Sequence, residues 1–290
     1  MKYFLTKSTN YLLRNLNQKK IKIEKIDYTE FADGERSYKL ARGLDDETAT
    51  LIGSIMPNPD SFFELLAIAN LLKTNGAKNL KLTIPYLGYA RQDRPARKGE
   101  GAAGIMVAKN LKNLKAARIG VLEPHSPLIF RALGKQAKII EVTSLFAKEL
   151  AKTSIDIIIA PDKGAIERIA RLAKQLGSKV KTGFIEKIRP RPNVAVARTL
   201  HGNVHGKNVL LFDDMIDTGG TIIQAVKLLK KHGAKQINVA ATHGIFSQNA
   251  RDRLTRLPIE KILVTNSLPQ TKHNKIKILN IIPLILDCLS

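Results

Sequence analysis

Residues 208–222 read NVLLFDDMIDTGGTI, and this segment decides the fold. The uninterrupted apolar run at 209–212 predicts a strand that is buried on both faces, as strands of parallel sheets are. Two aspartates end the run, and a third precedes the turn Thr-Gly-Gly-Thr. Residues 221–233 then carry apolar side chains at helical spacing. The segment therefore predicts the strand–loop–helix unit of an α/β protein.

Short apolar runs alternate with amphipathic stretches along the rest of the chain. Strands are expected at 49–55, 80–87, 118–123, 155–161, 208–214 and 236–244, and helices at 60–76, 164–177 and 221–233. Strand–helix–strand repetition implies a mostly parallel sheet with helices on both faces. The series runs once before residue 145 and once after it. We therefore expect two similar α/β domains, at 1–145 and 146–290.

Composition narrows the class of protein without deciding it. The chain has 48 basic and 25 acidic residues, a net charge of +23, which favours polyanions such as nucleic acid or phosphorylated small molecules. The basic residues are scattered, with no basic run interleaved with aromatic residues, so the charge alone does not indicate a nucleic-acid partner. A single cysteine, no apolar run of membrane length and an N-terminus interrupted by polar residues lead us to expect a cytoplasmic protein.

The loop after the strand at 208–214 has the composition of an anion site. Ligands of parallel sheets bind beyond the carboxyl ends of the strands, where Asp213 and Asp214 are expected. Two glycines let backbone N–H groups approach an anion, and the following helix adds its dipole. Carboxylates would repel that anion, so they suit sugar hydroxyls or a divalent cation instead. A ribose 5-phosphate moiety has both a phosphate and a diol. A plain turn with solvated aspartates is the other interpretation.

The segment FDDMIDTGGT resembles the ribose-phosphate-binding signature of type I phosphoribosyltransferases and of ribose-phosphate pyrophosphokinases. Five further segments resemble the second family in order and spacing, namely FADGE (31–35), IPYLGYARQDR (84–94), APDKGAIER (160–168), KIRPRPN (187–193) and ATHGIFS (241–247). This resemblance implies two tandem phosphoribosyltransferase-like domains. It also implies Mg²⁺-dependent transfer of the β,γ-pyrophosphoryl group of ATP to ribose 5-phosphate, which gives phosphoribosyl pyrophosphate (PRPP) and AMP.

The resemblance also assigns a role to each matched residue. Ribose 5-phosphate is expected at Asp213, Asp214, Asp217, Thr218, Gly219, Gly220 and Thr221. ATP is expected at Arg91 and Gln92, and at Phe31, Asp33 and Glu35 from a neighbouring subunit. The expected ligands of Mg²⁺ are His125 and Asp162, although the context LEPHSP differs from the family's usual Asp-Leu-His-Ala-Gly. Lys187 and Arg189 match the basic pair of the family's catalytic loop, where they would stabilise the transferring group.

Three other functions are compatible with parts of the sequence. A non-catalytic subunit of the same family would lose the metal ligands or the catalytic pair, which this chain keeps. A phosphoribosyltransferase would share only the loop at 213–221, and a nucleic-acid-binding role depends on net charge alone.

The chain is expected to form a homo-oligomer, and its size, from dimer to hexamer, is left open. Residues 95–104, PARKGEGAAG, lack the Lys-, Ser- and Arg-rich pattern of phosphate-activated members. Weak activation by phosphate and weak inhibition by ADP are therefore expected.

Overall fold

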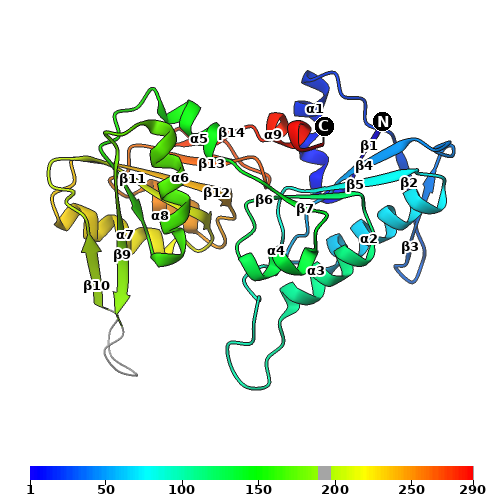
Figure 1. Cartoon of the computed structure of the whole chain (residues 1–290), viewed down its shortest axis with the longest axis horizontal. Helices are drawn as coiled ribbons and strands as arrows, with labels where there is room; N and C mark the ends of the chain where they lie inside the picture. Colours follow the sequence, from blue (N-terminus) through cyan, green and yellow to red (C-terminus); the bar gives the residue numbers. More distant parts are fainter. Residues whose placement is uncertain (189–196, 290) are drawn as a thin grey trace. The chain divides into compact units, whose positions relative to one another are not determined.

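A computed structural model describes residues 1–188 and 197–289 of the chain (Figure 1). The chain divides into two compact units, which are described separately below. Unit 1 comprises Met1–Glu141 together with Ile282–Ser290, and unit 2 comprises Val142–Ile281. The α/β class and the mostly parallel sheets expected from the sequence are confirmed, and each expected strand and helix is present.

Unit 1 is built on a five-stranded sheet in the order β1-β4-β5-β6-β7, in which every pair of neighbours is parallel. Its strands are β1 (Lys2–Leu5), β4 (Thr48–Ile52), β5 (Asn79–Ile84), β6 (Arg118–Leu122) and β7 (Ala137–Ile140). Helices α2 (Pro59–Thr74), α3 (Ala103–Asn113) and α4 (Pro127–Leu133) cover one face, and η1 (Lys7–Leu12), α1 (Leu13–Gln18) and α9 (Ile282–Leu289) lie on the other (Figure 1). The short hairpin of β2 (Ile26–Glu30) and β3 (Arg36–Leu40) stands outside this sheet.

The last helix, α9, packs on the sheet of unit 1. The backbone of Gly120 in β6 makes room for it, because a Cβ atom there would lie 2.9 Å from the Sγ atom of Cys288. Arg118 donates from Nη1 to the carbonyl oxygen of Cys288 at 2.6 Å, and Lys81 donates to that of Leu289. The chain thus returns to its first unit at Ile282, whereas the sequence assigned all of 146–290 to one domain.

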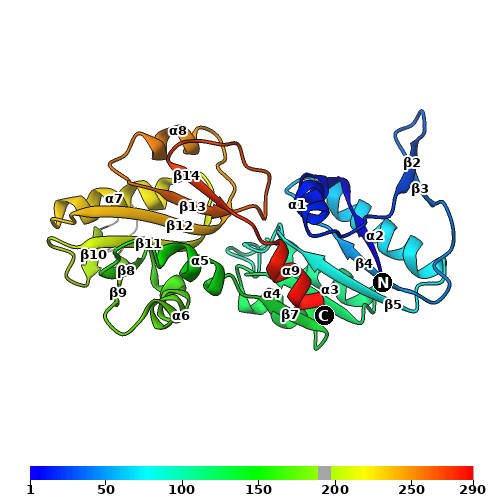
Figure 2. The same cartoon turned by 90° about the horizontal axis from the view of Figure 1, so that it is seen from above.

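Unit 2 is built on a seven-stranded sheet in the order β10-β9-β8-β11-β12-β13-β14. Its strands are β8 (Ile157–Ala160), β9 (Lys181–Ile188), β10 (Ala197–His201), β11 (Asn208–Ile216), β12 (Gln236–Gly244), β13 (Ile262–Thr265) and β14 (Ile276–Leu279). Among the described residues of this sheet, the β9–β10 pair alone is antiparallel. Figure 2 shows α7 (Gly220–Lys231) and α8 (Ala250–Thr255) on one face, and α5 (Thr143–Leu150) and α6 (Ile166–Leu176) on the other.

The central strand β11 is longer than the sequence indicated, and this shapes the edge of the sheet. Its pairing with β8 stops at Leu211, whereas its pairing with β12 continues to Ile216. Asp213 and Asp214 therefore lie inside the strand, as the expected strand at 208–214 implied, and beyond the last residue of β11 that pairs with β8. In the described part of the chain, no helix is long and apolar enough to cross a membrane.

Candidate active site

The loop after β11 has the geometry of an anion cradle. Gly219 has φ +76°, in the left-handed region, and is the N-cap residue of α7. Its carbonyl oxygen accepts a hydrogen bond from the amide of Ile223 at 2.8 Å, which starts the helix. The first amides of a helix have no partner within it, and the first turn of α7 contains no acidic residue. These amides and the helix dipole are thus available to a bound anion.

The start of α7 is one residue earlier than that of the helix expected at 221–233. The helix begins at Gly220, so Thr221 is in the first turn and Thr218 is the exposed residue before the cap. The helix starts early because a glycine at the cap allows the left-handed turn that a larger residue would resist. Both threonine hydroxyls still belong to the segment that forms the cradle.

Asp213 and Asp214 form a carboxylate pair beside this cradle. Asp214 is buried, with 5% of its surface exposed, and Asp213 is half-buried. Burial, together with repulsion from Asp214 and then Asp162, raises the pKa of Asp213 to about 8. The amide of Asp214 donates to Oδ1 of Asp213 at 2.9 Å and offsets part of this shift. Such a pair is stabilised by a proton, a cation or hydroxyl donors.

Asp162 lies next to this pair, although the sequence assigned it to a different ligand. It follows β8, the neighbour of β11, and its Oδ1 accepts from the amide of Gly164 at 3.0 Å. Its charge contributes to the raised pKa of Asp213, so the two carboxylates are within electrostatic reach. Among the described residues, no group of three or more His, Cys, Asp and Glu has the geometry of a metal site. The clustered carboxylate oxygens nevertheless fit a hard divalent cation.

Lys187 is in a strand and not in a loop. It is the penultimate residue of β9 and is in register with Arg198 of β10. The pairing of β9 with β8 ends at Phe184, so Lys187 lies where β9 and β10 extend beyond the sheet as a two-stranded ribbon. Arg189, the second residue of the expected catalytic pair, lies outside the described residues.

Three further site residues of the sequence analysis are in unit 1, in the loops after β5 and β6. Arg91, Gln92 and His125 are all exposed. The amide of Gln92 donates to the carbonyl oxygen of Tyr89 at 2.8 Å, which fixes the turn after β5. Tyr89 has φ +63° and Glu123, two residues before His125, has φ +37°. Left-handed residues other than glycine are strained, and such strain is often found at functional sites.

Sequence reasoning missed a contact that ties these two loops together. Ser126 donates from Oγ to Oδ2 of Asp93 at 2.6 Å and accepts from the amide of Leu128 at 3.1 Å. It is the N-cap of α4, so one hydroxyl begins the helix and joins the loop of Gln92 to that of His125. The sequence signalled the helix start, because serine before proline is typical of one, but it did not signal the contact with Asp93.

The segment FADGE forms the turn of the β2–β3 hairpin. Phe31 is 52% exposed, and its amide donates to the carbonyl oxygen of Glu35 at 2.8 Å. The amide of Glu35 donates to Oδ1 of Asp33 at 3.0 Å, so the turn is ordered by its own hydrogen bonds. Figures 1 and 2 show the hairpin well apart from the segment between β5 and α3. One chain therefore does not bring the two expected parts of the ATP site together.

The fold and the cradle at β11 define a protein of the phosphoribosyltransferase-like class. Residues 132–275 match the phosphoribosyl transferase domain family, and residues 1–114 match the N-terminal domain of ribose phosphate pyrophosphokinase. The ribose-phosphate pyrophosphokinase of Pyrococcus furiosus is 35% identical over 277 residues, which covers 94% of this chain and 95% of the relative. The enzyme of the same name from Aquifex aeolicus is 34% identical, with 89% and 84% covered.

A solved structure gives the same result. The crystal structure of phosphoribosylpyrophosphate synthetase from Mycobacterium smegmatis has a TM-score of 0.89 and 29% identity to this chain. The match covers 99% of this chain and 96% of that one. The chain belongs to the ribose-phosphate pyrophosphokinase family, as its motifs indicated.

Proposed function

We propose that this protein transfers the β,γ-pyrophosphoryl group of ATP to the anomeric hydroxyl of ribose 5-phosphate, with Mg²⁺ as the cofactor. The hydroxyl oxygen attacks the β-phosphorus, the bond from that phosphorus to the oxygen of AMP breaks, and the hydroxyl proton is released. The products are PRPP and AMP. The observation that carries the proposal is the open N-terminus of α7 directly after the carboxylates of β11.

Ribose 5-phosphate would bind along the segment 213–221. Its phosphate would accept from the amides of Gly220 and Thr221 and from the hydroxyl of Thr218. Its sugar hydroxyls would donate to Asp213 and Asp214, which would relieve the repulsion that raises the pKa of Asp213. Asp217 is half-buried between these two parts and would take a further hydroxyl. The sugar would then be held at both ends, which fixes the direction of its anomeric hydroxyl.

The ATP side would include residues of a second chain. Arg91 and Gln92 would hold the nucleotide, and Phe31 of a neighbouring subunit would stack on adenine while Asp33 and Glu35 accept from its amino group. A homo-oligomer with a shared ATP site is supported by the exposed Phe31 and by the separation of the hairpin from the β5–α3 segment. Asp162 and His125 would hold Mg²⁺, which neutralises phosphate charge when bound. Lys187 and Arg189 would stabilise charge on the transferring group.

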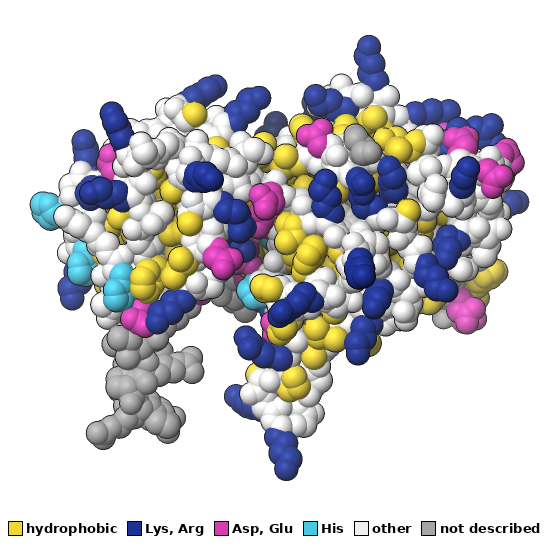
Figure 3. All heavy atoms as spheres, viewed as in Figure 1, with side chains coloured by type: hydrophobic (Ala, Val, Ile, Leu, Met, Phe, Trp, Pro, Cys, Tyr) yellow, Lys and Arg dark blue, Asp and Glu magenta, His cyan; other side chains and the backbone are white. Residues whose placement is uncertain are grey.

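The face of each unit that Figure 3 shows does not favour nucleic acid as the partner. Lys and Arg side chains are spread over the visible face of each unit and do not gather along one stripe (Figure 3). A nucleic-acid-binding face needs such a gathering to follow a phosphate backbone. The high net charge is instead compatible with two substrates that are both phosphorylated anions.

The proposal is tested by incubating the purified protein with ATP, ribose 5-phosphate and Mg²⁺ and separating AMP from ADP by chromatography. We expect AMP and PRPP in equal amounts, and their loss in Lys187→Ala. Lys181→Ala is the matched control, because Lys181 is an exposed lysine at the opposite end of the same strand. If folded and assembled protein forms no AMP, the proposal is wrong, and a non-catalytic subunit of the family is the function to test next.

A further inference from the structure

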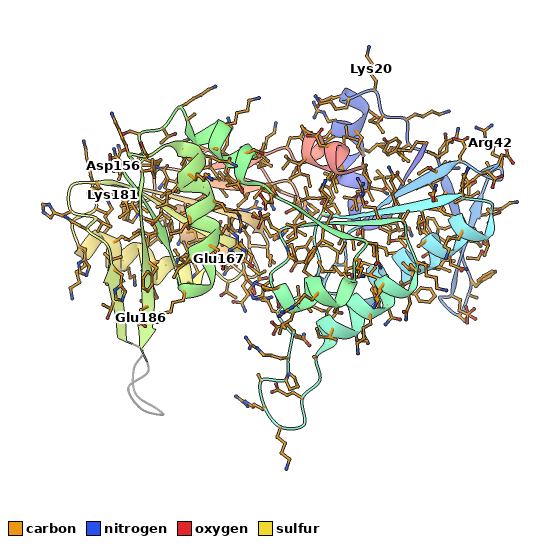
Figure 4. All side chains as sticks on the ribbon, in the orientation of Figure 1. Lys20, Arg42, Asp156, Glu167, Lys181 and Glu186 are labelled. Atoms are coloured by element: carbon orange, nitrogen blue, oxygen red, sulfur yellow. The ribbon has the colours of Figure 1, made fainter. Side chains whose placement is uncertain are left out.

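Glu186, which was not among the residues expected at the site, joins two segments of unit 2. It lies near the carboxyl end of β9 (Figure 4). Its Oε1 forms an ion pair with Nζ of Lys163, and its Oε2 lies 3.0 Å from Nε2 of His201. Each oxygen therefore has its own partner, one in the loop after β8 and one in β10.

The position of His201 is fixed by a second contact. Its ring stacks on that of Phe184, with ring centroids 4.4 Å apart and an interplanar angle of 12°. The two residues are in register between β10 and β9. His201 and Glu186 thus form a contact across the antiparallel pair, which holds the two strands together where β8 no longer supports them.

The two ends of the ion pair stand next to residues of the proposed chemistry. Lys163 directly follows Asp162, which is expected at the metal, and Glu186 directly precedes Lys187, which is expected at the transferring group. The ion pair therefore connects the loop that carries the carboxylate to the ribbon that carries the cation. The hydrogen bond from Lys163, and then that from His201, hold the pKa of Glu186 below its usual range, so the group stays charged.

We propose that Glu186 is a positioning residue for the reaction. It fixes the β9–β10 ribbon to the loop after β8 and so sets where Lys187 stands relative to Asp162. The partners are partly exposed, with side-chain exposures of 63% for Lys163, 27% for Glu186 and 43% for His201. Exposed ion pairs contribute little to overall stability, so the expected effect is on geometry and rate. The inference depends on the proposed function, because Lys187 has its role only there.

The test compares Glu186→Ala with Glu167→Ala in the full-length, assembled protein. Glu167 is an exposed carboxylate of α6 in the same unit, and Figure 4 marks both residues. Glu186→Ala is expected to lower kcat about 10–100-fold, the loss that a misplaced group of about 1 Å produces. The KM for ribose 5-phosphate should change less than about twofold, since the cradle of β11 and α7 is untouched. Glu167→Ala should leave both constants unchanged.

A charge exchange separates positioning from general damage. Lys163→Glu alone should lose activity as Glu186→Ala does, and the double variant Lys163→Glu/Glu186→Lys should regain part of kcat, because the ion pair is restored with reversed polarity. Hydrogen exchange gives a readout that needs no turnover. Backbone amides of residues 181–188 and 197–201 should exchange faster in Glu186→Ala and as in wild type in Glu167→Ala.

Glu186→Gln, which keeps the shape of the side chain, replaces Glu186→Ala if that variant does not fold, and the same direction of change is expected. Unchanged kcat and unchanged amide exchange in the substituted protein would overturn the inference. The absence of any recovery in the charge exchange, with folded protein, would also overturn it. If the wild type forms no AMP, the proposed function fails. The exchange experiment then decides separately whether Glu186 holds the ribbon.

Discussion

The carboxyl edge of the sheet in unit 2 differs in construction from the corresponding edge in unit 1. In unit 2 the residues of the cradle are consecutive, from Asp213 to Thr221, and one strand and one helix hold them. In unit 1 the residues expected at ATP come from the β2–β3 hairpin and from the loop after β5, and the residue expected at the metal comes from the loop after β6. A hydrogen bond between Ser126 and Asp93 links two of these loops. We infer that the first edge is preorganised within one chain, whereas the second is completed by assembly.

The largest effect is expected where the preorganised edge is most constrained, at Gly219. A Cβ atom there would lie 3.2 Å from Cδ1 of Leu254, and φ of +76° is unfavourable for alanine. Gly219→Ala should therefore displace the first turn of α7 and lower kcat/KM for ribose 5-phosphate by about 100-fold or more. Steady-state kinetics with ribose 5-phosphate varied at saturating ATP measure this.

Gly177→Ala is the control for Gly219→Ala. Gly177 has φ +113° with nothing near its would-be Cβ, so its substitution strains the backbone without touching the cradle. It should cost stability and leave kcat/KM unchanged. Equal kinetic losses in both variants would show that backbone strain, and not the cradle, controls the rate.

The assembled edge is tested at Phe31, with a smaller expected effect. Phe31→Ala should raise the KM for ATP about tenfold, because stacking on a base contributes about 1–3 kcal/mol, and should leave the KM for ribose 5-phosphate unchanged. Met106→Ala is the matched control, since Met106 is also 52% exposed and lies on α3.

Mixing variants tests whether the ATP site is shared between chains. At an ATP concentration below the wild-type KM, oligomers reassembled from Phe31→Ala and Lys187→Ala chains should be more active than the two separate variants together, because some sites then combine an intact hairpin with an intact β9. Each variant alone lacks such a site. Recovery no greater than the sum of the separate activities would place Phe31 and Lys187 of one site in the same chain.

The contrast between the two edges also explains how far the sequence could predict the site. The cradle was predictable because one continuous segment, residues 208–222, contains a buried strand, its carboxylates, the turn and the helix start, all of which depend on local chemistry. The family resemblance supplied the remaining site residues. Neither the local sequence nor the family resemblance indicated that Lys187 lies in a strand. This part of β9 is a strand because it pairs with β10, and such pairing between two segments leaves no signal in either one alone.

Other features escaped prediction because they join residues that are distant in sequence. The Cys288–Gly120 contact that places α9 in unit 1 spans most of the chain, and the Glu186–Lys163 pair joins two separate strand ends. Such contacts have no periodicity or spacing that would signal them. The length of β11 was not predictable for the same reason. The strand continues beyond its pairing with β8 because it still pairs with β12, which is a separate segment of the chain.

Substitution of Ser126 tests the hydrogen bond to Asp93 that links the loops after β5 and β6 in unit 1. Ser126→Ala removes a helix cap and the donor to Asp93, so it should lower the free energy of unfolding by about 1–2 kcal/mol. Denaturant unfolding measures this. Ser126→Thr retains the hydroxyl and should recover most of the loss. A loss as large in Ser126→Thr would mean that the hydroxyl contacts are not responsible.

The smallest effect is expected in the stability of the free protein at Asp213. Because the folded-state pKa of Asp213 is raised from 3.8 to about 8, the folded state retains a proton that the unfolded state releases between these values. The contribution of Asp213 to stability therefore falls as pH rises across this window and is most unfavourable above pH 8. Asp213→Asn removes this repulsion. It should raise the melting temperature at alkaline pH by about 2–4 °C, the shift that about 1 kcal/mol produces in a chain of this size.

The same variant should show almost no difference from wild type at a pH well below 3.8, where Asp213 is protonated in both the folded and the unfolded state. The comparison at acid pH is therefore the control for the comparison at alkaline pH. Ribose 5-phosphate should narrow the difference at alkaline pH, because its hydroxyls would stabilise the charged carboxylates of the wild type and bind the variant more weakly. Activity should meanwhile fall in Asp213→Asn. The carboxyl edge of the sheet in unit 2, which is preorganised for ribose 5-phosphate, would thus lower the stability of the protein when no ligand is bound. A variant less stable than wild type above pH 8 would contradict this, because the carboxylate pair would then stabilise the free protein.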